Sequence, residues 1–163
     1  MHIFDHLLAM PDELKNLFDD FPSLLFHQEP ESWDGIPGER FAITGQLCHL
    51  LDIEIQGYQH RFHRTVNETM PELPSLDGYL LAELNQYKQA DPKQVLMQFR
   101  LARLQTVKML KALKTEDYSR RANFGSYGEV SLLGLAHLLR SHDLQHLACM
   151  HWLRMRLLYS TEL

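Results

Sequence analysis

The sequence has few of the features that define several large protein classes. Its two cysteines, Cys48 and Cys149, are too few for a disulfide framework and predict reduced thiols. No lysine or arginine precedes the apolar residues of the first ten positions, so this stretch does not resemble a cleavable signal. From these two absences we expect a cytoplasmic protein.

Long apolar runs and a strong positive charge are also missing. The longest nearly apolar stretch, residues 132–139, is far shorter than the roughly 20 residues that a bilayer-spanning helix requires. The 16 basic and 21 acidic residues are mixed along the chain, and their net charge of −5 leaves no basic stripe for a row of phosphates. We therefore expect no membrane and no nucleic-acid partner.

What the sequence does contain is helical periodicity. With 163 residues, 45% of them hydrophobic, the chain is long enough for one sizeable core, and we expect a single domain over residues 1–163. Apolar residues recur with a helical period between proline and glycine breaks, and no stretch alternates as a half-buried strand would. The pattern predicts an all-α four-helix bundle with long connections, including a surface loop at 27–40. The expected helices start at Pro11 and run to about 21, then span about 41–67, 76–89, 92–113 and 131–156.

Four histidines lie within HLLRSHDLQHLACMHW, residues 137–152. His142 and His146 are four residues apart, so on a helix they project within about 40° of each other, on the apolar stripe. Two imidazoles in that arrangement can hold one metal ion. His137 and His151 are each turned by about 140° from the nearer member of the pair, and we expect both at the surface.

A bundle metal site draws ligands from facing helices, so a third histidine is expected elsewhere in the chain. His49 lies within the apolar stretch 43–55 and is the most buried candidate by pattern. His60 and His63 lie about 16 and 21 Å farther along the same helix axis and cannot bind the same ion. Ten histidines make a pair at this spacing common by chance, and from spacing alone packed core histidines are the more frequent outcome.

Three stretches carry a family resemblance: MPDELKNLF near the start, PGERFAITGQLCHLLDIE before and within the second long helix, and FGSYGEVSLLGLAHLLRSHDLQHLACMHWL at the end. They resemble the DinB-like superfamily, the damage-inducible and YfiT-like metalloenzymes, over nearly the whole chain. The resemblance implies a four-helix bundle with three histidine ligands, matched here by His49, His142 and His146. Phe41 and Ala42 stand where many relatives have Trp-Ser or Trp-Thr, which weakens the helix N-cap and leaves the ligands unchanged.

Three neutral imidazoles suit a divalent ion, with zinc first and nickel or iron as alternatives, and leave a coordination position open. Such an ion activates a small thiol or a water molecule near neutral pH. We expect an enzyme that transfers a low-molecular-weight thiol to a small-molecule substrate, as in superfamily members that are thiol-dependent transferases and isomerases. The alternatives are a metal-dependent hydrolase and a non-catalytic metal-binding stress-response module. The family also leads us to expect a homodimer.

Other polar side chains near the histidines have weaker claims on the site. Asp52, three residues after His49, is a weak candidate for orienting a ligand or accepting a proton. Cys149 lies one turn after His146 and could replace His49 as a ligand, although a small core residue needs no such role. Either Cys149 or Glu54 could instead close a four-ligand site, which would favour a non-catalytic metal-binding module. Asp143 points about 100° away from His142, so it either supports the site from behind or faces solvent.

Overall fold

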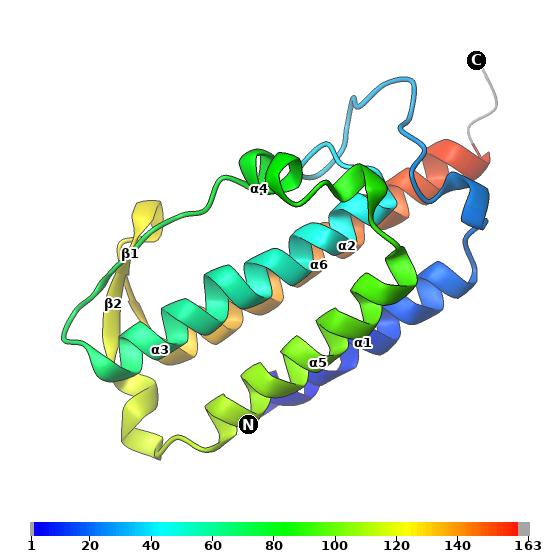
Figure 1. Cartoon of the computed structure of the whole chain (residues 1–163). Helices are drawn as coiled ribbons and strands as arrows, with labels where there is room; N and C mark the ends of the chain where they lie inside the picture. The colour runs from blue at the N-terminus through cyan, green and yellow to red at the C-terminus, as the bar shows by residue number, and fades with distance from the viewer. Residues whose placement is uncertain (1, 160–163) are drawn as a thin grey trace.

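The computed structural model describes residues 2–159, and long helices dominate it (Figure 1). α1 spans His2–Asp19, α5 spans Pro92–Lys111 and α6 spans Leu132–Tyr159. The second long helix is composite, with α2 (Ile43–Asp52), a π-helical segment (Ile53–Gln59) and α3 (His60–Asn67) following one another. The smaller elements are α4 (Gly78–Leu84), the 3-10 turns Ser23–Leu25, Tyr87–Gln89, Thr115–Ser119 and Gly125–Tyr127, and the strands β1 (Glu72–Leu73), β2 (Arg121–Phe124) and β3 (Glu129–Ser131).

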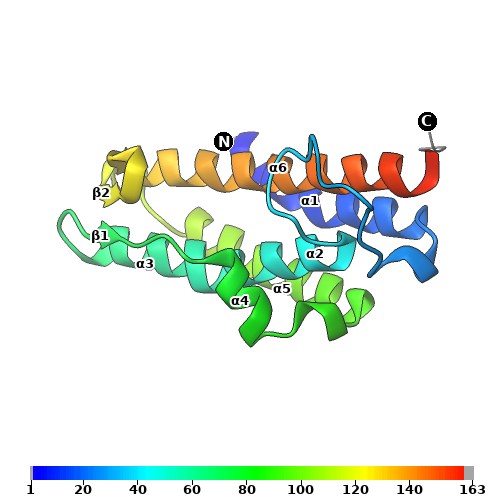
Figure 2. The same ribbon diagram turned by 90° about the horizontal axis from the view of Figure 1, so that it is seen from above.

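The four long helices form the predicted bundle (Figures 1 and 2). α1 packs against α5 and α6, and α2 packs against the same two helices. Consecutive helices α1 and α2 therefore occupy opposite corners of the bundle, as do α5 and α6. Residues 20–42 and 112–131 provide the long connections that this order of helices requires, so the predicted fold class is confirmed.

A small sheet covers one end of the bundle, beside α3 and the start of α6 (Figure 1). β1 pairs with β2 in parallel, with Glu72 opposite Asn123, and β2 pairs with β3 antiparallel, with Ala122 opposite Val130. The sequence pattern predicts no strands in these segments. Strands of two to four residues are too short to display the alternation by which a strand is recognised.

The predicted start of the first helix at Pro11 is wrong, because α1 begins at His2 and contains Pro11. Proline lacks the backbone N–H that would bond to the carbonyl four residues earlier, so Pro11 leaves the Leu7 carbonyl without its helical partner. The Arg103 Nη1 atom donates to that carbonyl at 3.1 Å and replaces the lost bond. Tertiary structure thus stabilises a helix through a residue that normally begins or breaks one.

The other boundaries follow local chemistry more closely. Asp91 caps α5 as its side chain accepts a hydrogen bond from the Lys93 backbone N–H, and Pro92 occupies the first turn as expected. The expected helix over 76–89 is shorter, covering only α4 and a following 3-10 turn. Within residues 2–159 no helix combines the length and apolarity needed to cross a membrane.

The core consists of two apolar clusters separated by a polar layer. One cluster lies toward the sheet and includes Leu7, Phe62 and Leu139, and the other lies toward the opposite end and includes Met10, Phe99 and Met150. Between them the helices bury polar side chains with no more than 4% exposure. The layer includes His49, Glu54, Arg103, Asp143 and His146, whereas Arg61 packs on Tyr58 and Phe124 of the cluster toward the sheet. This interruption of an otherwise apolar core is where the candidate site lies.

Candidate metal centre

The three expected histidines meet in this polar layer. His49 comes from α2, and His142 and His146 come one turn apart from α6. The Nε2 atom of His142 lies 3.3 Å from that of His49 and 3.2 Å from that of His146. One ligand atom from each residue lies within 4.8 Å of the other two, which is the arrangement of three donors around one ion.

Gln46 fixes the orientation of His146. Its Nε2 atom donates to the backbone carbonyls of Glu39 and Phe41 at 2.7 and 3.2 Å, which turns its Oε1 atom toward His146. That oxygen lies 2.5 Å from His146 Nδ1, so Nδ1 carries the proton and the Nε2 lone pair points at the other histidines. Gln46 was not singled out from the sequence, although a glutamine inside an apolar helix three residues before His49 is a usable signal.

The triad is electrically neutral at neutral pH. Burial, followed by the charges of His49, Arg61 and Arg103, lowers the pKa of His142 to about 3. Burial and the neighbouring histidines lower the pKa of His146 to about 2. Burial also lowers the pKa of His49, against the opposing effect of Glu39 and Asp52. Neutral imidazole is the form that binds a metal, so the surroundings prepare all three rings as ligands.

The donor set fits a divalent cation. The Nδ1 atoms of His49 and His142 are buried and have no hydrogen-bond partner. The Nε2 atom of His142 lies 3.3 and 3.2 Å from the Nε2 atoms of His49 and His146, a spacing at which three lone pairs can point at one ion. A cation at the centre would accept all three lone pairs. Gly78 leaves the space that the His49 ring needs, because a Cβ atom there would lie 2.6 Å from His49 Cε1.

Glu39 is a site residue that the sequence analysis missed. It belongs to the loop before α2, where the Glu39 carbonyl accepts from Gln46 and the Pro37 carbonyl accepts from Gln145 on α6. Its Oε2 atom is buried, has no hydrogen-bond partner and lies 3.7 Å from His146 Nε2. Residues 27–40 have no periodicity, so nothing in the sequence places this carboxylate beside the histidines.

A cavity of about 200 Å³ adjoins the triad. His49 and His142 line it on one side, and Glu39, Tyr58 and Arg61 are among the other lining residues. Tyr58 and Arg61 come from the π-helical segment and from α3, immediately after it. The segment widens the helix by one residue, a distortion common at functional sites, and here it accompanies the change from apolar packing to cavity lining.

Two of the weaker candidates lie outside this cavity. Asp52 accepts hydrogen bonds from Tyr87 Oη at 2.6 Å and Asn85 Nδ2 at 2.7 Å, in a separate hollow that Cys48 also lines. Cys149 is buried, and burial raises the pKa of its thiol to about 12, so the sulfur remains protonated near neutral pH. Among residues 2–159, the group able to hold an ion consists of the three histidines without Cys149.

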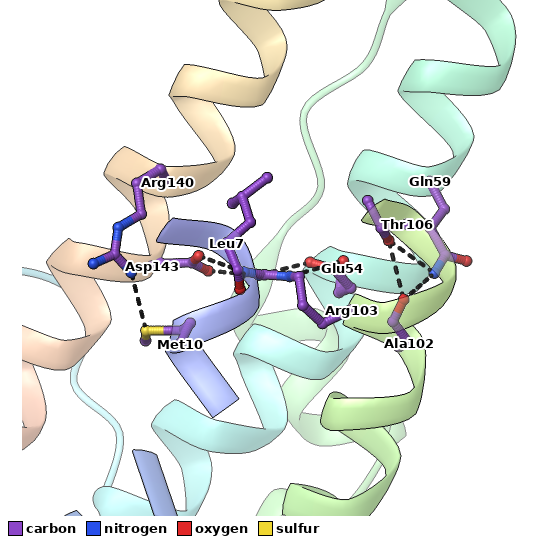
Figure 3. Close-up of polar contacts among 9 residues, drawn as sticks. All are labelled: Leu7, Met10, Glu54, Gln59, Ala102, Arg103, Thr106, Arg140 and Asp143. Carbon is purple, nitrogen blue, oxygen red and sulfur yellow. Dashed lines mark hydrogen bonds and ion pairs between the residues drawn. The ribbon is translucent and has the colours of Figure 1, made fainter. Parts of the chain in front are cut away.

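Asp143 does not face solvent, because it is fully buried and bound to Arg103 (Figure 3). The guanidinium of Arg103 lies between Asp143 and Glu54 and donates to both carboxylates and to the Leu7 carbonyl. These four residues come from all four long helices. Glu54 is therefore committed to Arg103 and is not part of the three-histidine group. His137 and His151 are exposed, as expected.

Comparisons with known proteins give a family match and a solved structure with a similar fold. A family model described as the DinB superfamily matches residues 6–150. Among solved structures, the chain is similar to YfiT from Bacillus subtilis, described as a probable metal-dependent hydrolase with an unusual four-helix bundle topology. That similarity has a TM-score of 0.81 and 21% sequence identity, and it covers 97% of this chain and 87% of that one. A search of curated protein sequences gives no match.

Proposed function

The chain belongs to the DinB superfamily, and from this premise we propose that it is a metal-dependent hydrolase whose ion is held by His49, His142 and His146. Zinc suits three neutral nitrogen donors with an open position. When bound, such an ion lowers the pKa of water and polarises a carbonyl oxygen. The substrate class proposed here is a small ester or amide that enters the adjoining cavity.

The observation that carries the choice of hydrolysis is the unpartnered Oε2 atom of Glu39, 3.7 Å from His146 Nε2. A carboxylate oxygen at that position can take a proton from an attacking water and return it to the leaving group. The sequence lacks the glutamate of an HExxH motif, and Glu39 supplies an equivalent group from a loop. A thiol is deprotonated outright when it coordinates a divalent ion and needs no such base, so this carboxylate favours hydrolysis over the thiol transfer expected from the sequence.

The three histidines can be tested by elemental analysis of the purified protein. His146→Ala is expected to lose most of the bound metal, because the ion keeps only two protein ligands. The exposed His137→Ala is the matched control from the same helix and is expected to retain the wild-type metal content. Equal metal content in all three proteins would refute the ligand assignment.

The role of Glu39 can be tested on the zinc-loaded enzyme with 4-nitrophenyl acetate. Glu39→Gln keeps the size and shape of the side chain but cannot accept the proton, and we expect kcat to fall about 10²- to 10⁴-fold with metal content retained. A parallel assay measures transfer of cysteine to chlorodinitrobenzene. Thiol transfer that exceeds hydrolysis and survives Glu39→Gln would replace the hydrolase proposal by the transferase alternative.

A further inference from the structure

Arg61 is a buried cation without a compensating anion. Its side chain belongs to a residue that is only 4% exposed, and its Nε atom is buried without a hydrogen-bond partner. The guanidinium donates one hydrogen bond, from Nη2 to the Pro74 carbonyl at 3.1 Å. Over residues 2–159 no carboxylate forms an ion pair with it. Burying an unpaired charge is costly, so its presence in this position requires an explanation.

The packing around Arg61 holds the guanidinium in place. Its Cζ atom lies 5.0 Å from the centre of the Tyr58 ring and 4.4 Å from that of the Phe124 ring, both within the range of cation–π attraction. Gly57 leaves room for the head group, because a Cβ atom there would lie 2.9 Å from Arg61 Nη1. The group is therefore oriented by contacts that neutralise none of its charge.

This oriented cation lines the same cavity as the histidine triad. Among the lining residues Arg61 is the one permanent cation and Glu39 the one acid, and the two form no ion pair with each other. A ligand anion in the cavity would provide the partner that the protein does not.

We infer that Arg61 recognises a carboxylate of the substrate, so that the site acts on small esters or amides that also carry a carboxylate group. The identification of this ligand as a substrate rests on the proposed hydrolase function. The anion-binding site itself does not depend on that function. A carboxylate suits the guanidinium N–H groups that remain beside the single hydrogen bond to the Pro74 carbonyl. A singly charged group is also favoured over phosphate, because Glu39 lies in the same cavity and repels additional negative charge.

Binding can be measured without turnover by calorimetric titration of glutarate into the zinc-loaded full-length protein. We expect Arg61→Met to weaken glutarate binding about 10- to 100-fold, which is the range for losing charge-assisted hydrogen bonds. Arg61→Lys keeps the charge and loses the fork, so it should bind glutarate with intermediate affinity. Arg156→Gln is the matched control: Arg156 also has a buried Nε without a partner and packs on Trp152, but it does not line the cavity.

Kinetics give the second measurement, with mono(4-nitrophenyl) glutarate as the anionic ester and 4-nitrophenyl acetate as the neutral one. Arg61→Met is expected to lower kcat/KM for the anionic ester about 10- to 100-fold more than for the neutral ester. Metal content and thermal unfolding of each variant show whether it folds. If Arg61→Met does not fold, Arg61→Lys provides the same comparison between the two esters.

The two proposals fail in different ways. Glutarate binding that depends on Arg61 in a protein that hydrolyses neither ester would support the anion site and refute the hydrolase. Hydrolysis of both esters with the same response to Arg61→Met would support the hydrolase and refute the anion site. The carboxylate assignment is overturned if Arg61→Met and Arg156→Gln bind glutarate like the wild type, or if wild type binds inorganic phosphate more tightly than glutarate.

Discussion

Arg103 and Arg61 are both buried and each donates to a backbone carbonyl, yet only Arg103 has carboxylate partners. All five N–H groups of Arg103 donate hydrogen bonds, four of them to the carboxylates of Glu54 and Asp143. Arg61 makes one hydrogen bond, to a neutral carbonyl, and packs between two aromatic rings. The first arginine completes the interior of the fold, whereas the second leaves a charge free at a cavity.

The difference also separates two kinds of buried polarity. Burial alone would lower the pKa of Arg103, but the charges and hydrogen bonds of Glu54 and Asp143 raise it. For Arg61, burial lowers the pKa and no carboxylate opposes it. A satisfied network ties four helices together, and an unsatisfied group faces the space where a ligand can bind. We expect mutations of the Arg103 network to reduce stability more than ligand binding, and mutations of Arg61 to reduce ligand binding more than stability.

The largest expected effect on stability comes from Arg103→Met. It leaves two buried carboxylates and the Leu7 carbonyl without their donor, and we expect the free energy of unfolding to fall by about 3–5 kcal/mol. Arg61→Met removes a charge that has no carboxylate partner, so its cost should be within about 1 kcal/mol. Denaturant unfolding of the two variants measures this contrast. Equal losses would show that the two arginines do not differ in the way their contacts indicate.

A second effect, of about 2 kcal/mol for each histidine, concerns acidification of the metal-free protein. The folded-state pKa values of about 3 for His142 and about 2 for His146 lie below the ordinary value of 6.5. With respect to these two groups, the free energy of unfolding is therefore highest above about pH 6.5. It falls as the pH decreases toward the folded-state pKa values, because the unfolded chain takes up protons first. At about pH 5 the loss amounts to about 2 kcal/mol for each ring.

His142→Gln should remove about one third of this pH dependence, because the pKa values of His49 and His146 are lowered by burial as well. The matched control is His137→Gln, which replaces an exposed histidine on the same helix and should retain the full wild-type slope. Unfolding of chelator-treated protein between about pH 7 and pH 5 provides the measurement. An unchanged slope in His142→Gln would mean that the triad is not kept neutral by burial.

The sequence predicts the elements of the site that follow helical spacing. His142 and His146 share one face of α6, and His49 interrupts the apolar stretch of α2, so helical geometry and burial pattern are enough to select these three residues. Glu39 could not be selected in this way, because it enters from a loop whose path depends on contacts with Gln46 and Gln145.

The remaining differences between prediction and structure also come from contacts that are distant in sequence. Pro11 lies inside a helix because Arg103, 96 residues from Leu7, satisfies the freed Leu7 carbonyl. A period of 3.6 residues does not reveal the π-helical segment, since one additional residue per turn shifts the faces that follow it. Asp143 illustrates the same point: its direction on α6 was predictable, but its buried partner on α5 was not.

The smallest expected effect on the network around Arg103 comes from Asp143→Asn, and it tests whether this network is separate from the metal centre. Asparagine keeps one acceptor oxygen, and Glu54 still neutralises Arg103, so the variant loses about one charge-assisted hydrogen bond. We expect the free energy of unfolding to fall by about 1.5 kcal/mol. Zinc content and glutarate affinity should stay at wild-type values, although Asp143 is adjacent to His142 in sequence. A loss of either one with stability intact would show that Asp143 positions His142, and the satisfied and unsatisfied regions would then have to be treated as one coupled site.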